Sequence, residues 1–548
     1  MDAARAIVAE VLGDVPPKPQ LQVIGSDLPA STQALRDLFA VKSHLYDRGG
    51  VVVKLAHPAD GGPPMAVELT AHGVVCEAHR LCQPVAWHGD TLKAVTLSER
   101  VAKMYLDLRG EWRLPALDGI TTAPVLTADG AILDRDGYDA TARLWCAKVP
   151  AVSVPDKPTR TDAAKALTLL RYALRTFPFG DAPRVIEADA KLSVVDVSKP
   201  ALLDETAALA GLLTAVCRPS LHLAPGLLVT EPQISGAGAG KGLLVRALCL
   251  IAFGTPPRAF TAGAEKSELD KRLVAELIEA APALFLDNVN NTALRSDLLA
   301  SVLTERPARV RILGKSLMVP LNSTAFIAVT GNGLSVSEDL ARRFLSCNLD
   351  AQMEDPEARP FAPGFLGRVL AERPAALAAV LTIWRWGRQN QHSMTRGQRL
   401  GSFETWTEWV RDPLLTLGCA DPVDRILAAK ASDPQRKRVT ELFECWYDHH
   451  HINGLAAKEL HDDVRQIADP GGKGRQFLSA YLDKMTGTRS GGFVLQQHKP
   501  LGKWGTTVYA LGITDQEAVK ARAEARQRAS QVKPSHGDDR PDGGGWPS

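Results

Sequence analysis

A glycine-rich stretch with one lysine carries the clearest chemical signal in the chain. Residues 235–242 read Ser-Gly-Ala-Gly-Ala-Gly-Lys-Gly, after an apolar run at 227–229 and before an apolar segment at 243–251. Glycines let successive backbone N–H groups point at one anion, a helix N-terminus adds partial positive charge, and a lysine can reach terminal phosphates. The order therefore predicts a strand, a phosphate-binding loop and a helix.

The stretch departs from the P-loop pattern at two positions. Ser235 stands where the first glycine belongs, and Gly242 stands where a Ser or Thr hydroxyl would bind Mg²⁺. A glycine-rich surface turn is the alternative for this stretch taken alone. The predicted ATP-binding residues are Ser235, Gly236, Ala237, Gly238, Ala239, Gly240, Lys241, Gly242 and Leu243.

An acidic residue ends a later apolar strand. An amphipathic helix at 267–281 precedes the apolar residues 283–286, and Asp287 and Asn288 follow. In P-loop ATPases a carboxylate at this strand end holds Mg²⁺, so we expect Asp287 to bind the ion. Asn288 replaces the usual glutamate that polarises the attacking water. A buried strand that merely ends in a solvated aspartate is the alternative, but the intervening helix suits the crossover of a doubly wound sheet.

Two further motifs complete the predicted catalytic set. The apolar run 323–329 ends in Thr-Gly-Asn, and the Asn332 amide could orient a water or contact the γ-phosphate. Arg342 and Arg343 precede another apolar run, and arginine spreads several donors across a phosphate while staying charged. A solvated surface pair is the alternative for the two arginines. The predicted catalytic residues are Lys241, Asp287, Asn288, Asn332, Arg342 and Arg343.

The order of these motifs resembles the AAA+ ATPases, and within them the superfamily 3-like helicase modules of phages and integrative elements. The motifs are SGAGAGKG, LFLDN, VTGN and DLARRF, and the likeness covers residues 200–350. A weaker likeness continues through 406–424. Residues 114–139 resemble a block found ahead of ATPase modules in proteins of bacterial prophages and integrative elements.

The resemblance implies roles for individual residues. Lys241 would bind the β- and γ-phosphates of ATP, Asp287 would bind Mg²⁺, and Asn332 would be the sensor. Arg342 or Arg343 would act as a finger on the nucleotide of a neighbouring subunit. A finger in trans implies a ring-shaped homo-oligomer, which we expect to be a hexamer.

Two basic segments are candidates for DNA contact. Residues 309–312 alternate Arg and apolar side chains, which predicts a strand, and Leu-Gly-Lys-Ser at 313–316 predicts a turn. In related ATPases a basic hairpin in this place projects into the pore of the ring, and a solvated hairpin face is the alternative. Later, three helical segments and a strand pair follow the order of a winged helix. The predicted nucleic-acid residues are Arg309, Arg311, Lys315, Arg475 and Lys484.

Two groups of His and Cys could suggest a metal. The first lacks the paired spacing of zinc ligands, and its apolar spacing favours an amphipathic helix; it comprises His72, Cys76, His79, Cys82 and His88. The second is the run His449-His450-His451, whose three consecutive side chains cannot share a helical face. We expect the run to be a solvated turn.

Composition limits the class of protein. The 64 Lys and Arg nearly balance 62 Asp and Glu, so any DNA contact must come from local patches. The eight Cys show no paired spacing, which favours a reducing cytosol over a disulfide framework. There is no signal-peptide pattern, and no apolar run approaches ~20 residues. We expect a cytoplasmic protein without a membrane partner.

The expected fold class is α/β, with a P-loop AAA+-type ATPase core between an N-terminal α+β domain and a C-terminal winged-helix domain. The expected boundaries are 1–150 for the N-terminal domain, 151–200 for a linker and helical adaptor, 201–355 for the core, 356–432 for a helical lid, 433–513 for the winged helix and 514–548 for a disordered tail.

The leading functional hypothesis is an ATP-dependent helicase or replication-initiation motor of a mobile element. It would act on single-stranded DNA or a replication origin, with a primase or other replication proteins as candidate partners. A nucleotide-switched DNA-binding or assembly protein without processive hydrolysis is the alternative, because Gly242 and Asn288 depart from the usual catalytic residues. An ATPase acting on protein is a third possibility, against which the basic hairpin and the winged-helix order argue.

Overall fold

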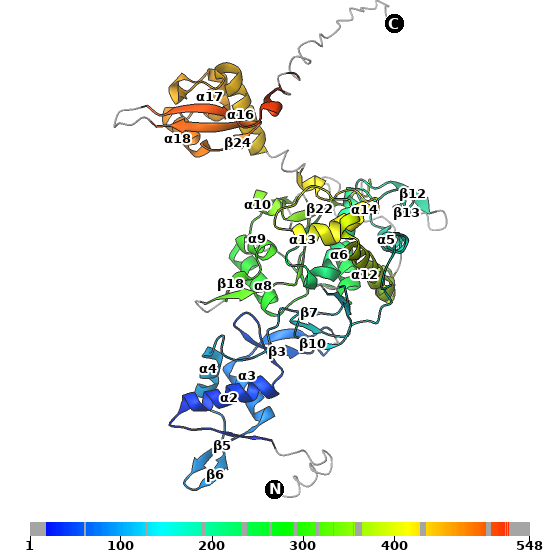
Figure 1. The fold of residues 1–548 in the computed structure, drawn as a ribbon, viewed down its shortest axis with the longest axis vertical. Coiled ribbons are helices and arrows are strands. Elements are labelled where there is room, and N and C mark those ends of the chain that lie inside the picture. The colour runs from blue at the N-terminus through cyan, green and yellow to red at the C-terminus, as the bar shows by residue number, and fades with distance from the viewer. Residues whose placement is uncertain are drawn as a thin grey trace, which may run out of the picture. The chain divides into compact units, whose positions relative to one another are not determined.

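The chain divides into two compact units, Met1–Ile426 and Leu427–Ser548, which are described separately (Figure 1). The computed structural model describes residues 18–59, 62–127, 130–187, 192–231, 238–261, 266–289, 293–312, 317–332, 334–353, 356, 364–427, 434–499, 506–520, 522 and 524. Among the described helices, none combines the length and apolar composition needed to span a lipid bilayer.

The first unit begins with a small α+β module. Its strands form the sheets β1-β5-β6 and β2-β3-β4 around a core that includes Phe39, Val101, Tyr105 and Trp112. The elements are β1 (Gln20–Gln22), α2 (Leu28–Lys42), β2 (Leu45–Asp47), β3 (Val52–Ala56), β4 (Met65–Glu68), α3 (Ala71–Leu81), β5 (Gln83–His88), β6 (Thr91–Ala94) and α4 (Glu99–Asp107).

Helix α3 contains three members of the first group of His and Cys residues. It spans His72, Cys76 and His79, buries Val74 and Ala78 on its apolar face, and leaves Cys76 exposed. His79 uses its Nε2 to accept the Leu97 N–H at 3.2 Å. Among the described residues these side chains do not gather into a group that could hold an ion. The amphipathic-helix interpretation is therefore confirmed.

Short strands follow the module. They are β7 (Gly119–Thr121), β8 (Val125–Leu126), β9 (Ile132–Leu133), β10 (Gly137–Asp139) and β11 (Leu144–Cys146). Arg48 joins the module to the rest of the unit, because its buried guanidinium donates to the carbonyls of Leu277, Ile278, Leu117 and Asp118. Burial lowers the pKa of Arg48 to about 10.

A parallel sheet forms the centre of the first unit, so the α/β class is confirmed. Its described strands run in the order β15-β16-β20-β14-β22, and every neighbouring pair is parallel. The strands are β14 (Gly226–Glu231), β15 (Ala259–Phe260), β16 (Ala283–Leu286), β20 (Phe326–Asn332) and β22 (Phe344–Asn348). Strands that are buried on both faces, such as β16, have continuous apolar sequences, because helices cover both faces of a parallel sheet.

Helices surround this sheet. Leu269, Leu273 and Leu277 of α8 are buried in one core with Leu284 and Leu286 of β16. The helices are α5 (Arg160–Leu174), α6 (Leu203–Cys217), α7 (Lys241–Phe253), α8 (Lys266–Ile278), α9 (Asp297–Thr304), α10 (Glu338–Ala341), α11 (Phe365–Ala371), α12 (Arg373–Gln389), α13 (Glu404–Trp406) and α14 (Asp412–Thr416).

The unit also contains shorter strands outside the central sheet. They are β12 (Arg184–Glu187), β13 (Leu192–Val195), β17 (Ala293–Leu294), β18 (Ala308–Ile312), β19 (Leu317–Leu321) and β21 (Ser335–Val336). Figure 1 draws β18 beside α8 and α9, and the helices contact this strand. Trp384 and Trp386 of α12 are buried and pack in the interior of the unit.

The second unit places helices before most of its sheet. The sheet has the order β23-β26-β25-β24 with antiparallel pairs, and its core includes Phe443, Trp446, Leu482 and Tyr509. The elements are α16 (Pro434–His450), β23 (Leu455–Ala456), α17 (Asp462–Ala468), α18 (Arg475–Met485), β24 (Arg489–Ser490), β25 (Phe493–His498) and β26 (Val508–Ile513).

Candidate functional site

The glycine-rich stretch ends at the first turn of α7. Gly238 and Gly240 have φ values of 120° and 94°, which a residue with a Cβ rarely adopts. Lys241 is the first residue of α7 and is buried, while Leu243 is half-buried. Ser235, Gly236 and Ala237 lie outside the described residues. The described part therefore has the strand–glycine turn–helix order that the sequence predicts.

Lys241 points back to the strand that precedes the loop. Its Nζ lies 2.5 Å from Oε1 of Glu231, the last residue of β14. The two side chains are 8% and 1% exposed. Sequence reasoning missed Glu231, although an acid at the end of a buried strand and directly before a glycine-rich loop is a signal that could have singled it out.

Asp287 lies against the first turn of α7. A Cβ added to Gly242 would lie 3.5 Å from each carboxylate oxygen of Asp287 and 2.6 Å from Nη1 of Arg246. Arg246 forms an ion pair with Asp287 at 3.2 Å. The Arg246 guanidinium thus occupies the space beside Gly242 in which a Ser or Thr side chain would lie.

Strand β20, which lies between β14 and β16 in the sheet, carries residues that lie beside both Asp287 and Glu231. Thr330 of β20 donates its hydroxyl to Asp287 at 2.6 Å and accepts the Asn288 N–H at 3.1 Å. Asn332, at the end of β20, is the register partner of Glu231. Asn288 is exposed and has a positive φ of 57°. Lys241, Asp287 and Asn332 thus lie at one edge of the sheet, and Asn288 is exposed there.

The two arginines have different surroundings. Arg343 is 15% exposed and donates to the Ala300 carbonyl at 2.5 Å, to Thr304 at 3.0 Å and to Asp339 at 3.0 Å. Arg342 is 53% exposed and pairs with Asp339. Arg343 therefore connects α10 to α9, whereas Arg342 lies at the surface.

Alanine substitutions should separate these two arginines. We expect Arg343→Ala to lower the free energy of unfolding by about 2 kcal/mol, because charged hydrogen bonds to α9 are lost. Arg342→Ala should change it by less than about 0.5 kcal/mol, as is usual for an exposed side chain. Urea unfolding of both variants measures the difference, and equal losses would contradict it.

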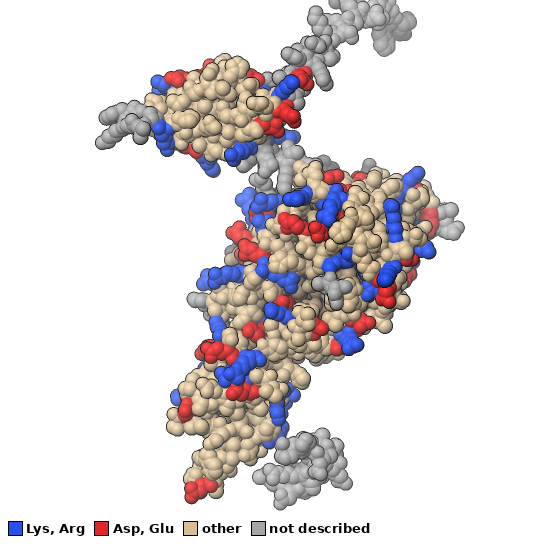
Figure 2. Space-filling model, in the orientation of Figure 1, with Lys and Arg blue, Asp and Glu red and all other residues tan. Residues whose placement is uncertain are grey.

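Basic side chains line one face of the β18–β19 hairpin. The strands pair antiparallel from Ala308↔Leu321 to Ile312↔Leu317, which confirms the predicted strand at 309–312. Arg309 and Arg311 are exposed, and Val310 and Ile312 are buried. Lys315 lies outside the described residues. In the face drawn in Figure 2, basic and acidic side chains are interspersed over the described surface.

Arg475 and Lys484 of the second unit are both exposed. Arg475 begins α18 and Lys484 lies near its end. Nine positions correspond to about two and a half helical turns, so the two side chains leave opposite sides of the helix. The sequence grouped them in one interface, and the helix does not bring them together.

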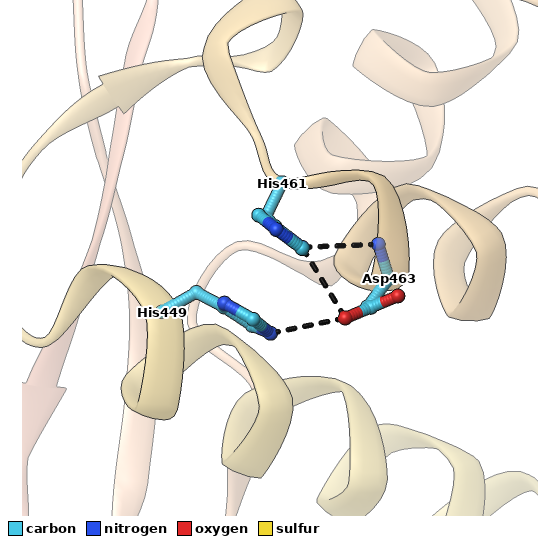
Figure 3. A group of neighbouring side chains, drawn as sticks. All are labelled: His449, His461 and Asp463. Atoms are coloured by element: carbon cyan, nitrogen blue, oxygen red, sulfur yellow. Dashed lines mark hydrogen bonds and ion pairs between the residues drawn. The ribbon is translucent and has the colours of Figure 1, made fainter.

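A cluster in the second unit unites residues that the sequence keeps apart (Figure 3). His449 Nε2 and His461 Nδ1 lie 3.2 and 3.3 Å from Oδ2 of Asp463. These exposed side chains form a group close enough to hold a metal ion. However, the imidazole rings stack with centroids 3.8 Å apart, and His461 Nδ1 accepts the Asp463 N–H at 3.3 Å. A nitrogen lone pair used in this way favours a hydrogen-bonded cap of α17 over a metal ligand.

Comparison with known proteins gives remote structural likeness. No protein-family model matches the chain, and no curated protein matches it. An A-form apo structure of the NrS-1 C-terminal region is 14% identical with a TM-score of 0.31, over 60% of this chain and 83% of that chain. Two further apo structures of that region are 10% and 12% identical with TM-scores of 0.32, over 84% of this chain and 96% of theirs.

Proposed function

We propose that the first unit binds and hydrolyses ATP and that the chain is a DNA-remodelling motor, a helicase or replication-initiation ATPase of a mobile element. The placement of Lys241, Asp287 and Asn332 at one edge of the parallel sheet carries this proposal. Ligands of open α/β sheets bind outside the carboxyl ends of the strands. The AAA+, superfamily 3-like assignment rests on the order of the motifs along the chain.

The residues present fit a triphosphate and its Mg²⁺. The first turn of α7 offers backbone N–H groups and a partial positive charge, and Lys241 adds a full charge. Asp287 would hold Mg²⁺, which neutralises phosphate charge when bound. The Arg246 guanidinium lies beside Gly242 and Asp287 in the nucleotide-free chain, so it would have to move aside for the ion. Asn332 would orient the terminal phosphate or a water, and Arg342 would reach the nucleotide of a neighbouring subunit in a ring.

Two features support DNA as the partner. The exposed Arg309 and Arg311 on the β18–β19 hairpin can grip phosphates without reading sequence. In the second unit, the order α16, β23, α17, α18 and then β24 to β26 is typical of a winged helix. Arg475 begins α18, and this exposed helix start is the part of the unit we assign to DNA.

DNA-dependent ATP turnover tests this function. We expect the full-length chain to hydrolyse ATP in the presence of Mg²⁺, and single-stranded DNA to raise the rate several-fold. Arg309→Ala with Arg311→Ala should abolish the stimulation and leave the DNA-free rate unchanged, because both side chains are exposed on a strand outside the central sheet. A rate that DNA does not change would contradict the motor.

A nucleotide-switched assembly protein is the second candidate. Asn288 has no carboxylate that could take a proton from water, and it faces solvent. Gly242 provides no hydroxyl for Mg²⁺. ATP binding that changes DNA affinity or oligomeric size without measurable turnover would favour this candidate over the motor.

A further inference from the structure

Glu231 is a buried charged group of the site to which the ATPase mechanism gives no role. Its side chain is 1% exposed, and the ion pair with Lys241 is the polar contact that the described residues give its carboxylate. A buried carboxylate is costly unless a cation compensates it. Lys241 supplies that compensation in the nucleotide-free chain.

The same ammonium group is needed by the phosphates. Lys241 is the first residue of α7, so it carries a positive charge at the helix start where phosphates would bind. Glu231 presents a fixed negative charge 2.5 Å from the Lys241 Nζ. Because like charges repel strongly in a poorly hydrated site, a bound triphosphate and the Glu231 carboxylate compete for one cation.

Asp287 provides a contrast within the same site. Its carboxylate is shared between the Thr330 hydroxyl and Arg246, so it does not depend on Lys241. Glu231 has no such second partner among the described residues. Only the Glu231 pair must therefore be rearranged when Lys241 turns to a phosphate.

We propose that Glu231 is a positioning residue that holds Lys241 in the nucleotide-free site and competes with the phosphates for it, which lowers affinity and speeds release. This inference rests on the proposed nucleotide site. Its register partner is Asn332, the predicted sensor, so Glu231 lies beside the residue that would detect the terminal phosphate. The Glu231–Lys241 pair is thus an internal substitute for the phosphate contact.

Glu231→Gln tests the competition. We expect the variant to bind a fluorescent ATP analogue about tenfold more tightly, equivalent to ~1.4 kcal/mol, with slower release in stopped flow. ATP should also raise the melting temperature of the variant more than that of the wild type, because phosphate then replaces the counter-charge that Lys241 has lost. Glu231→Asp keeps the charge on a shorter side chain and should fall between the two.

Glu205→Gln is the matched control. Glu205 is also 1% exposed and pairs with Arg171 at 2.7 Å, but it lies on α6 and outside the nucleotide site. Its substitution should lower stability without changing ATP affinity or release. Equal or weaker ATP binding by Glu231→Gln would overturn the proposal, whereas failure of wild type and variant alike to bind ATP would overturn the proposed nucleotide site.

A measurement without nucleotide tests the pair itself. An amine-reactive reagent followed by mass spectrometry reports the labelling rate of Lys241. We expect slow labelling in the wild type and labelling several-fold faster in Glu231→Gln, with no change at Lys241 in Glu205→Gln. Identical rates in the wild type and Glu231→Gln would show that Glu231 does not hold the lysine.

Discussion

Lys241→Met is expected to weaken nucleotide binding strongly and to destabilise the first unit. The substitution removes the ammonium group and leaves the buried Glu231 carboxylate without a cation. Breaking a buried ion pair on one side costs about 3–5 kcal/mol. Loss of the phosphate contact should weaken ATP binding by about 100-fold, since truncating one partner of a buried charge pair costs 2–5 kcal/mol. Urea unfolding and titration with a fluorescent ATP analogue measure the two effects.

Two further variants separate those effects. Lys241→Met combined with Glu231→Gln removes both charges, so stability should return to within about 1 kcal/mol of the wild type, whereas ATP binding should stay weak. Arg171→Met breaks the buried Arg171–Glu205 pair in the same unit and should destabilise without changing ATP affinity. Wild-type ATP affinity in Lys241→Met would exclude Lys241 from the site.

Local sequence pattern predicted the elements that carry the site. The apolar run at 283–286 became β16 with Asp287 directly after it, and the amphipathic segment at 267–281 became α8. These predictions succeed because buried parallel strands and amphipathic helices have strong periodic signatures. The roles of Lys241, Asp287, Asn288 and Asn332 remain predictions, to which the structure adds their neighbours.

Which side chains meet in the site depends on tertiary contacts that the sequence pattern does not predict. Glu231 and Lys241 are ten positions apart, and no loop pattern specifies that their side chains meet. Arg342 and Arg343 are indistinguishable as neighbours in the chain, yet only Arg343 reaches α9. His449, His461 and Asp463 gather because α16 ends beside the start of α17, which the His run alone does not reveal. Each case depends on how separate elements pack.

Asp287→Asn is expected to lower ATP turnover at saturating nucleotide by about 100-fold, the scale on which one charge-stabilising group acts in catalysis. The amide keeps the shape of the side chain and can still accept the Thr330 hydroxyl, so the fold should persist. It loses the negative charge that would hold Mg²⁺. The Mg²⁺ concentration at which turnover reaches half its maximum should therefore be far higher in the variant. Asp270→Asn, at a carboxylate of α8 that accepts the Ser296 hydroxyl, is the matched control.

Arg246 gives the opposite expectation for the same metal. Its guanidinium lies 3.2 Å from Asp287 and occupies the space beside Gly242, so Mg²⁺ must compete with it for the carboxylate. Arg246→Ala removes that competitor, and we expect turnover to reach half its maximum at a lower Mg²⁺ concentration than in the wild type. A higher requirement in Arg246→Ala would mean that the arginine supports the site, and an unchanged requirement in Asp287→Asn would exclude Asp287 as the metal ligand. Because the two variants shift the metal requirement in opposite directions, general loss of stability cannot produce both results.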